Sequence, residues 1–190
     1  MRPSSLRRET GFVLLTSLIL LAILVIVAGA MLRSVNLHHR ITGVLRDKQV
    51  ALTSAVAAER YAEWWLTQSS PSPIVCTSVQ TMVTASVCSN ALVNPNALPW
   101  VALDGSGTSH GVGISYAPPT NVLSVNAAGG ANQVYASPGF YIVPLPGGTS
   151  NTTDYQINAY GYGGAQDSVA VVQSTVSVTT GYGSPESSQQ

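Results

Sequence analysis

The chain has 190 residues, of which only 8% are charged, whereas charged residues make up about a quarter of a typical soluble domain. All eight Lys and Arg residues lie at or before Arg60, and the formal net charge is zero. The chain beyond Arg60 therefore lacks the clustered basic residues that binding to nucleic acid requires.

An uncharged apolar stretch runs from Phe12 to Leu32. As a helix, its 21 residues span roughly 31 Å, which matches the hydrocarbon thickness of a bilayer. The stretch therefore predicts a membrane segment. A leader with Arg2, Arg7 and Arg8 precedes it, and basic residues next to a membrane segment favour the cytoplasmic side.

Three interpretations of this membrane segment remain open. The first is a plain single-pass anchor. The second is a secretory signal peptide, because Ala28-Gly29-Ala30 offers small residues for cleavage just before Met31. The third is a type IV prepilin leader, residues 1–11, which ends in Gly11 and is cut before Phe12, so that the apolar helix stays in the mature protein.

The helical pattern continues beyond the apolar stretch. Apolar residues recur every three or four positions as far as Leu66, which places them on one helix face. The sequence thus predicts one continuous helix of about 55 residues, roughly 80 Å long. Residues 12–32 form its apolar half and residues 33–68 its amphipathic half. The tryptophans at its end, Trp64 and Trp65, are expected to pack against a sheet.

The only two cysteines, Cys76 and Cys88, follow the helix. An isolated pair with this spacing predicts a structural disulfide, which would stabilise the fold by roughly 3 kcal/mol and place the head outside the cytoplasm. Zinc would need two further ligands, and the only nearby candidate is His110. We also expect His110 to stand without a carboxylate nearby, so no catalytic, cofactor-binding or metal-binding residues are predicted.

The rest of the chain predicts a β-rich head over residues 69–180 and a flexible tail over residues 181–190. Ten of the eleven prolines and fourteen of the seventeen glycines come after residue 70, as expected of turns and strands. Residues 91–111 are predicted to form loops. Apolar and polar residues then alternate in segments that are expected to form roughly four antiparallel strands packed on the helix, a fold of the α+β class. These segments are Val112–Tyr116, Gln133–Val143, Asp154–Tyr160 and Ser168–Thr179. The alternation puts Tyr155, Ile157 and Ala159 on one side, which implies that one face of the sheet is buried and the other is wet.

Several segments resemble type IV pilin-like proteins, and specifically the PilX family of minor pilins. Thr16 stands where most pilins carry Glu, and PilX-like proteins often lack that Glu too, which implies a minor, tip-located subunit. Val56 departs from the family, which commonly has a Glu there. The segments that carry the resemblance are Arg8–Leu32 with its Gly11-Phe12 junction, Arg40–Ala51, Tyr155–Ala159, Gly161–Gly164 and Val169–Ser174.

The resemblance implies a type IV pilin-like fold, cleavage between Gly11 and Phe12, and methylation of the Phe12 amine. It implies a single-pass protein of the bacterial inner membrane with a periplasmic head, which then enters the pilus at the cell surface. There it would help prime assembly and sit near the tip, supporting twitching motility and adhesion.

The partners implied by the resemblance are other minor pilins, the major pilin, the prepilin peptidase and a PilY-type tip adhesin, with no nucleic acid, small-molecule substrate or cofactor. Two alternatives remain: a minor pseudopilin of a type II secretion system, and a secreted or anchored adhesin-like β domain.

Overall fold

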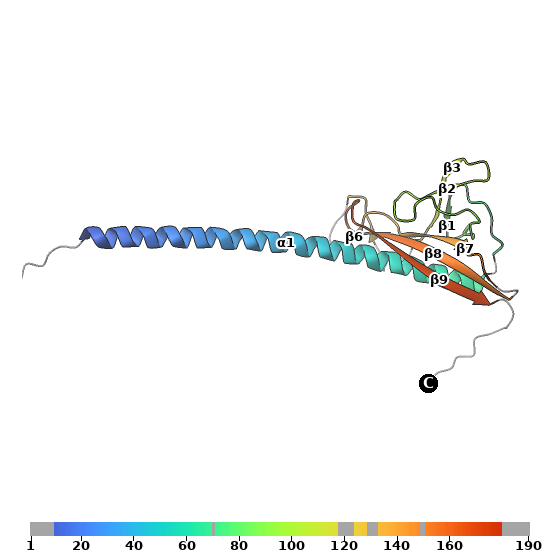
Figure 1. Ribbon diagram of the computed structural model, residues 1–190, viewed down its shortest axis with the longest axis horizontal. Coiled ribbons are helices and arrows are strands. Elements are labelled where there is room, and N and C mark those ends of the chain that lie inside the picture. The colour runs from blue at the N-terminus through green and yellow to red at the C-terminus, as the bar shows by residue number, and fades with distance from the viewer. Residues whose placement is uncertain (1–9, 70, 118–123, 129–132, 149–150, 180–190) are drawn as a thin grey trace, which may run out of the picture. The chain divides into compact units, whose positions relative to one another are not determined.

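The computed structural model describes residues 10–69, 71–117, 124–128, 133–148 and 151–179. The chain divides into two compact units, residues 1–45 and residues 46–190. One helix, α1 (Thr10–Gln68), contributes to both units and is 59 residues long (Figure 1). The second unit, which we call the head, contains all the strands found in the described residues.

The main sheet of the head has five strands in the order β1-β4-β7-β8-β9. β1 pairs with β4 in parallel, and the other neighbours pair antiparallel. The α+β prediction is therefore confirmed, but the sheet is mixed and not antiparallel throughout. Parallel neighbours need a long connection, which residues 82–112 supply. The strands are β1 (Val79–Thr81), β4 (Gly113–Ser115), β7 (Gly139–Pro144), β8 (Thr152–Tyr162) and β9 (Val169–Thr179).

Two small sheets lie outside the main one. β2 (Val101–Leu103) and β3 (Ser109–Gly111) form an antiparallel hairpin, although residues 91–111 were expected to be loops. Three-residue strands are too short to show the alternation that predicts a strand. β5 (Ser124–Val125) and β6 (Gln133–Val134) pair in parallel.

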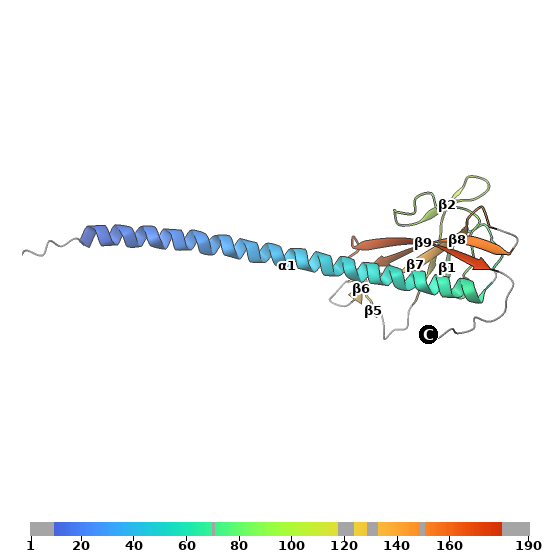
Figure 2. The ribbon, with the colours of Figure 1, turned by 60° about the horizontal axis from the view of Figure 1, so that its bottom comes forward.

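The first hydrophobic core lies between α1 and the main sheet, and Figures 1 and 2 both show the C-terminal part of α1 running along this sheet. Ala58, Ala62 and Leu66 of α1 are buried in this core together with residues of β8. The predicted inner face of β8 is confirmed. Its buried residues are Tyr155, Ile157 and Ala159.

The paired tryptophans at the end of α1 have different surroundings. Trp65 is half-buried and packs against the first core, as predicted. Trp64 remains 56% exposed and contacts the ring of Tyr61.

A second core covers part of the opposite face of the sheet. Side chains alternate along β7, so Phe140 and Ile142 enter the first core whereas Tyr141 enters the second. Trp100 is buried against Tyr141 and Tyr160. The expectation that this whole face is wet was wrong, because the chain between β1 and β4 folds over it. The buried members of this core are Cys76, Cys88, Trp100, Ala102, Val112 and Tyr141.

Candidate functional site

The apolar segment of α1 is the first candidate site. Phe12–Met31 is long and apolar enough to cross a membrane, and none of it is buried within the chain. The exposed fraction of its large apolar side chains ranges from 45% at Val27 to 71% at Ile26. Membrane anchors and signal sequences share this length and composition. Such a surface is stable only in lipid or against other apolar helices.

Two hydroxyl groups interrupt this segment, and both are hydrogen-bonded within the helix. Thr16 Oγ1 donates to the Val13 carbonyl at 2.9 Å, and Ser17 Oγ donates to the Leu14 carbonyl at 2.8 Å. A polar group that is satisfied by its own helix costs less to transfer into hydrocarbon than a free one. Thr16 therefore fits an apolar environment without a partner from another chain.

The expected processing site lies at the start of α1. Gly11 belongs to its first turn, and the side chain of Phe12 is 68% exposed. Residues 1–9 of the expected leader lie outside the described residues. Cleavage after Gly11 and methylation of Phe12 stay predictions.

Within the head, two glycines of the last hairpin let the backbone of β8 approach α1. A Cβ atom on Gly161 would lie 2.4 Å from the Ala55 nitrogen and 2.5 Å from the Ala51 oxygen. A Cβ atom on Gly163 would lie 2.6 Å from the Asp47 carbonyl oxygen. Helix and sheet are thus in backbone contact here, which only small residues allow.

Two charged residues of α1 fasten the turn between β8 and β9. The carboxylate of Asp47 accepts a hydrogen bond from the Gly164 amide. The ammonium group of Lys48 donates to the Val169 carbonyl at 3.1 Å and to the Asp167 carbonyl at 3.5 Å. These contacts join residues more than a hundred positions apart and fix the helix against the hairpin.

The predicted disulfide between Cys76 and Cys88 is present, with 5.4 Å between the two Cα atoms. The Cys88 amide donates to the Ile142 carbonyl at 2.8 Å, which ties the disulfide loop to the main sheet. Both cysteines are buried in the second core. The disulfide therefore anchors the segment that covers the outer face of the sheet.

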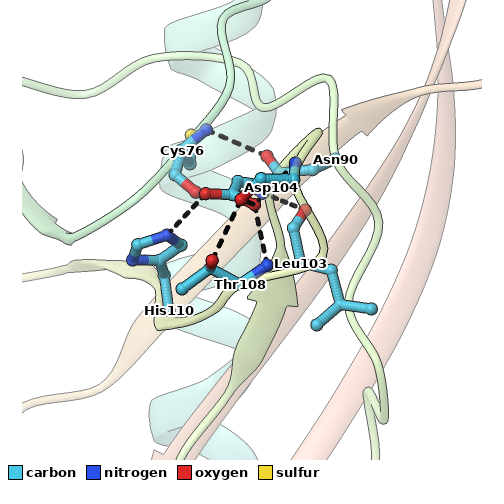
Figure 3. Close-up of polar contacts among 7 residues, drawn as sticks. Cys76, Asn90, Leu103, Asp104, Thr108 and His110 are labelled. Atoms are coloured by element: carbon cyan, nitrogen blue, oxygen red, sulfur yellow. Dashed lines mark hydrogen bonds and ion pairs between the residues drawn. The ribbon is translucent and has the colours of Figure 1, made fainter.

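Asn90 connects the disulfide loop to the β2–β3 hairpin (Figure 3). Its side chain accepts from the Cys76 amide at 2.9 Å and donates to the Cys76 carbonyl at 2.9 Å and the Leu103 carbonyl at 3.2 Å. The hydroxyl of Tyr141 donates to the Asn90 carbonyl, and burial raises the pKa of Tyr141 to about 12. The sequence carried no signal for Asn90, because its partners are distant along the chain.

The expectation that His110 lacks a nearby carboxylate was wrong. His110 Nε2 lies 3.0 Å from Asp104 Oδ2, because the hairpin brings the ends of β2 and β3 together (Figure 3). The other carboxylate oxygen accepts from the Ser106 hydroxyl at 2.6 Å and the Thr108 amide at 2.8 Å. The Ser106 hydroxyl, His110 and the Thr108 amide hold the pKa of Asp104 well below its ordinary range.

This arrangement closes a turn, and it does not pair the Ser106 hydroxyl with His110 as a nucleophile with its base. Ser106 and His110 contact opposite oxygens of Asp104, so the hydroxyl is hydrogen-bonded to the carboxylate and not to the imidazole. Over the described ranges, no group of three or more His, Cys, Asp or Glu side chains is placed to hold a metal ion.

No protein-family model, curated protein or solved structure matches this chain.

Proposed function

We propose that this protein is an assembly subunit of the type IV pilus, a minor pilin of the PilX kind that helps prime the pilus and sits at or near its tip. The observation that carries the proposal is α1, an uninterrupted helix whose exposed apolar segment continues into residues buried beneath the sheet of the head. The sequence resemblance and the disulfide-stabilised head add support.

In this proposal, the basic leader stays on the cytoplasmic side of the inner membrane and the head folds in the periplasm. A peptidase removes the leader after Gly11, and the Phe12 amine is methylated. The apolar segment then leaves lipid for contacts with the helices of other minor pilins and of the major pilin. The replacement of lipid contacts by helix contacts is driven by close packing of the helices. Small residues such as Ala22 and Gly29 permit this close packing.

Only the C-terminal part of α1 is buried in the head, so packing in the head does not explain the exposed apolar surface of Phe12–Met31. A secreted β domain would lose the segment by cleavage after Ala30, yet α1 continues through Ala28–Ala30 without a break. In the proposal, α1 is kept whole as an assembly element.

Deletion of the gene in the host tests the proposal. We expect the strain to lose surface pili and twitching and to secrete type II substrates normally, with recovery when the wild-type gene is returned. Normal pili with lost secretion would assign the protein to a type II secretion system as a pseudopilin. A strain normal in both respects would contradict the proposal.

The Gly11→Val variant tests the processing step. We expect it to accumulate with its leader and to leave the strain without pili, because the peptidase needs a small residue before the cleaved bond. Gly105→Ala is the matched control, since a Cβ atom there meets nothing within 4 Å. Normal pili from Gly11→Val would contradict the assignment.

A further inference from the structure

Among the residues that the structure describes, β9 forms a free edge of the main sheet. It is the last strand in the sheet order and is 11 residues long, with no charged residue, Gly or Pro. Natural sheets usually block such an edge with Lys, Pro, a bulge or a covering segment, because its unpaired backbone groups bind another strand. β9 has neither Lys nor Pro, so its own residues do not block the binding of another strand.

The register shows which backbone groups of β9 are free. The Ser168 carbonyl accepts from the Gly163 amide at 2.7 Å, whereas the Val169 carbonyl accepts from Lys48. Because inward and outward groups alternate in an antiparallel pair, the odd-numbered residues point their N–H and C=O groups away from β8. Within the part of the chain that the structure describes, no hydrogen-bond partner meets the outward groups of Val171, Gln173, Thr175 and Ser177.

An acidic helix flank runs beside this edge. Lys48 contacts the start of β9, and Ser69 and Val178 line one cavity at its other end, so α1 and β9 run in the same direction. Glu59 and Glu63 follow Lys48 by 11 and 15 residues, which places them on the same side of α1. At 1.5 Å per helical residue and about 3.3 Å per strand residue, they lie roughly level with Ser174 and Val176.

These two glutamates are suited to a basic partner. Both are half-buried, and neither has an ion-pair partner among the described residues. Arg60 adjoins Glu59 and lies three residues before Glu63, but no ion pair joins it to either in the described residues, and beyond Arg60 the chain has no Lys or Arg. The β9 strand of a second copy is also uncharged, so self-pairing would leave both carboxylates unneutralised.

We propose that the free edge of β9 binds an extended segment of a different protein as a sixth strand, with two basic residues on the face toward α1. The rise between Glu59 and Glu63 is about 6 Å, close to the spacing of alternate strand residues, so the segment has the pattern basic-x-basic. Backbone hydrogen bonds supply affinity, and the two basic residues supply specificity. This inference does not depend on the proposed pilus function.

The test uses the full-length protein in detergent and the synthetic peptide TVTKTKTVT, which reads the same in both directions and so allows either strand orientation. We expect saturable binding and slowed amide exchange at Val171, Gln173, Thr175 and Ser177. The peptide TVTETETVT should bind about tenfold more weakly, because its carboxylates face Glu59 and Glu63. Unchanged exchange at the four amides would overturn the proposal, and so would equal binding of the two peptides.

Variants of the edge and of the flank separate the two contributions. Thr175→Pro removes an outward N–H that β8 does not use and should abolish binding, whereas Thr175→Val keeps this N–H and should bind normally. Gln173→Pro repeats the edge test at an independent position if Thr175→Pro unfolds. The double variant Glu59→Gln, Glu63→Gln should bind both peptides equally.

Two further results would contradict the proposal. Binding to Thr175→Pro at wild-type strength would show that the peptide sits elsewhere. Protection of the four amides that rises with protein concentration and without peptide would show that a second copy occupies the edge.

Discussion

Gly161 shows how a single residue controls the contact between helix and sheet. Its missing side chain lets the backbone of β8 touch the backbone of α1 at Ala51 and Ala55. The neighbouring atoms belong to a hydrogen-bonded helix and not to flexible side chains, so they cannot move aside independently. The alanines of α1 and this glycine therefore act together to bring the two layers close.

Gly161→Ala should lower the free energy of unfolding of the head by ~2 kcal/mol or more, because the added methyl group overlaps helix backbone. Thermal unfolding of the full-length protein in detergent measures this. Gly105→Ala, which has open space around it, should leave the melting temperature unchanged. Equal melting temperatures for the two variants would show that α1 and β8 are not in backbone contact.

Asp104 makes the β2–β3 hairpin sensitive to acid. Its folded pKa lies below the ordinary value of 3.8, chiefly because the Ser106 hydroxyl and His110 favour the carboxylate. The unfolded chain therefore binds the proton first as the pH falls. The stabilisation is fully present above pH 3.8 and is lost as the pH falls below that value.

Asp104→Asn should remove this part of the acid dependence. The wild-type protein and the variant are compared by their melting temperatures across the acid range. We expect the difference between them to shrink below pH 3.8, where Asp104 of the unfolded wild-type chain takes up a proton before Asp104 of the folded chain does. If the difference in melting temperature stays constant with pH, the contacts in the folded hairpin do not stabilise the ionised carboxylate of Asp104.

At the scale of elements, the disulfide loop holds a covering layer on the sheet. The loop contains β1 and is tied to β7 through the Cys88 amide. Asn90 then extends this layer to the β2–β3 hairpin. Removing the cross-link should therefore loosen the second core more than the first.

The double variant Cys76→Ser, Cys88→Ser should lower the free energy of unfolding by ~2–4 kcal/mol, because the unfolded chain is no longer constrained. Amide exchange should accelerate at Ala102 and Val112 and stay slow at Ile157 and Ala159, which lie in the first core. Uniform acceleration across both cores would contradict this division of the head.

The long periodic elements could be predicted from the sequence, and the short ones could not. The even helical spacing up to Leu66 indicated α1, and the alternation of Tyr155, Ile157 and Ala159 indicated the inner face of β8. β1 has three residues and pairs with a strand more than thirty positions away, so no local pattern marks it. The pair of Asp104 and His110 likewise forms only when the hairpin brings the two residues together.

At the scale of the whole molecule, a role in the pilus requires that the mature protein keeps the apolar segment of α1. A prepilin keeps this segment and uses it for assembly, a secreted domain loses it, and a plain anchor keeps it together with its leader. The exposed side chains of Phe12–Met31 are the surface in question. The chemical identity of the mature N-terminus separates these three outcomes.

The most direct test is to purify the mature protein from its own host and determine its N-terminal residue by mass spectrometry. The account predicts a chain that begins at N-methylated Phe12. A chain that begins at Met31 would mean a cleaved signal peptide and a free head, and an intact Met1 would mean a simple membrane anchor. Either of these two results would contradict the proposal of a pilus subunit.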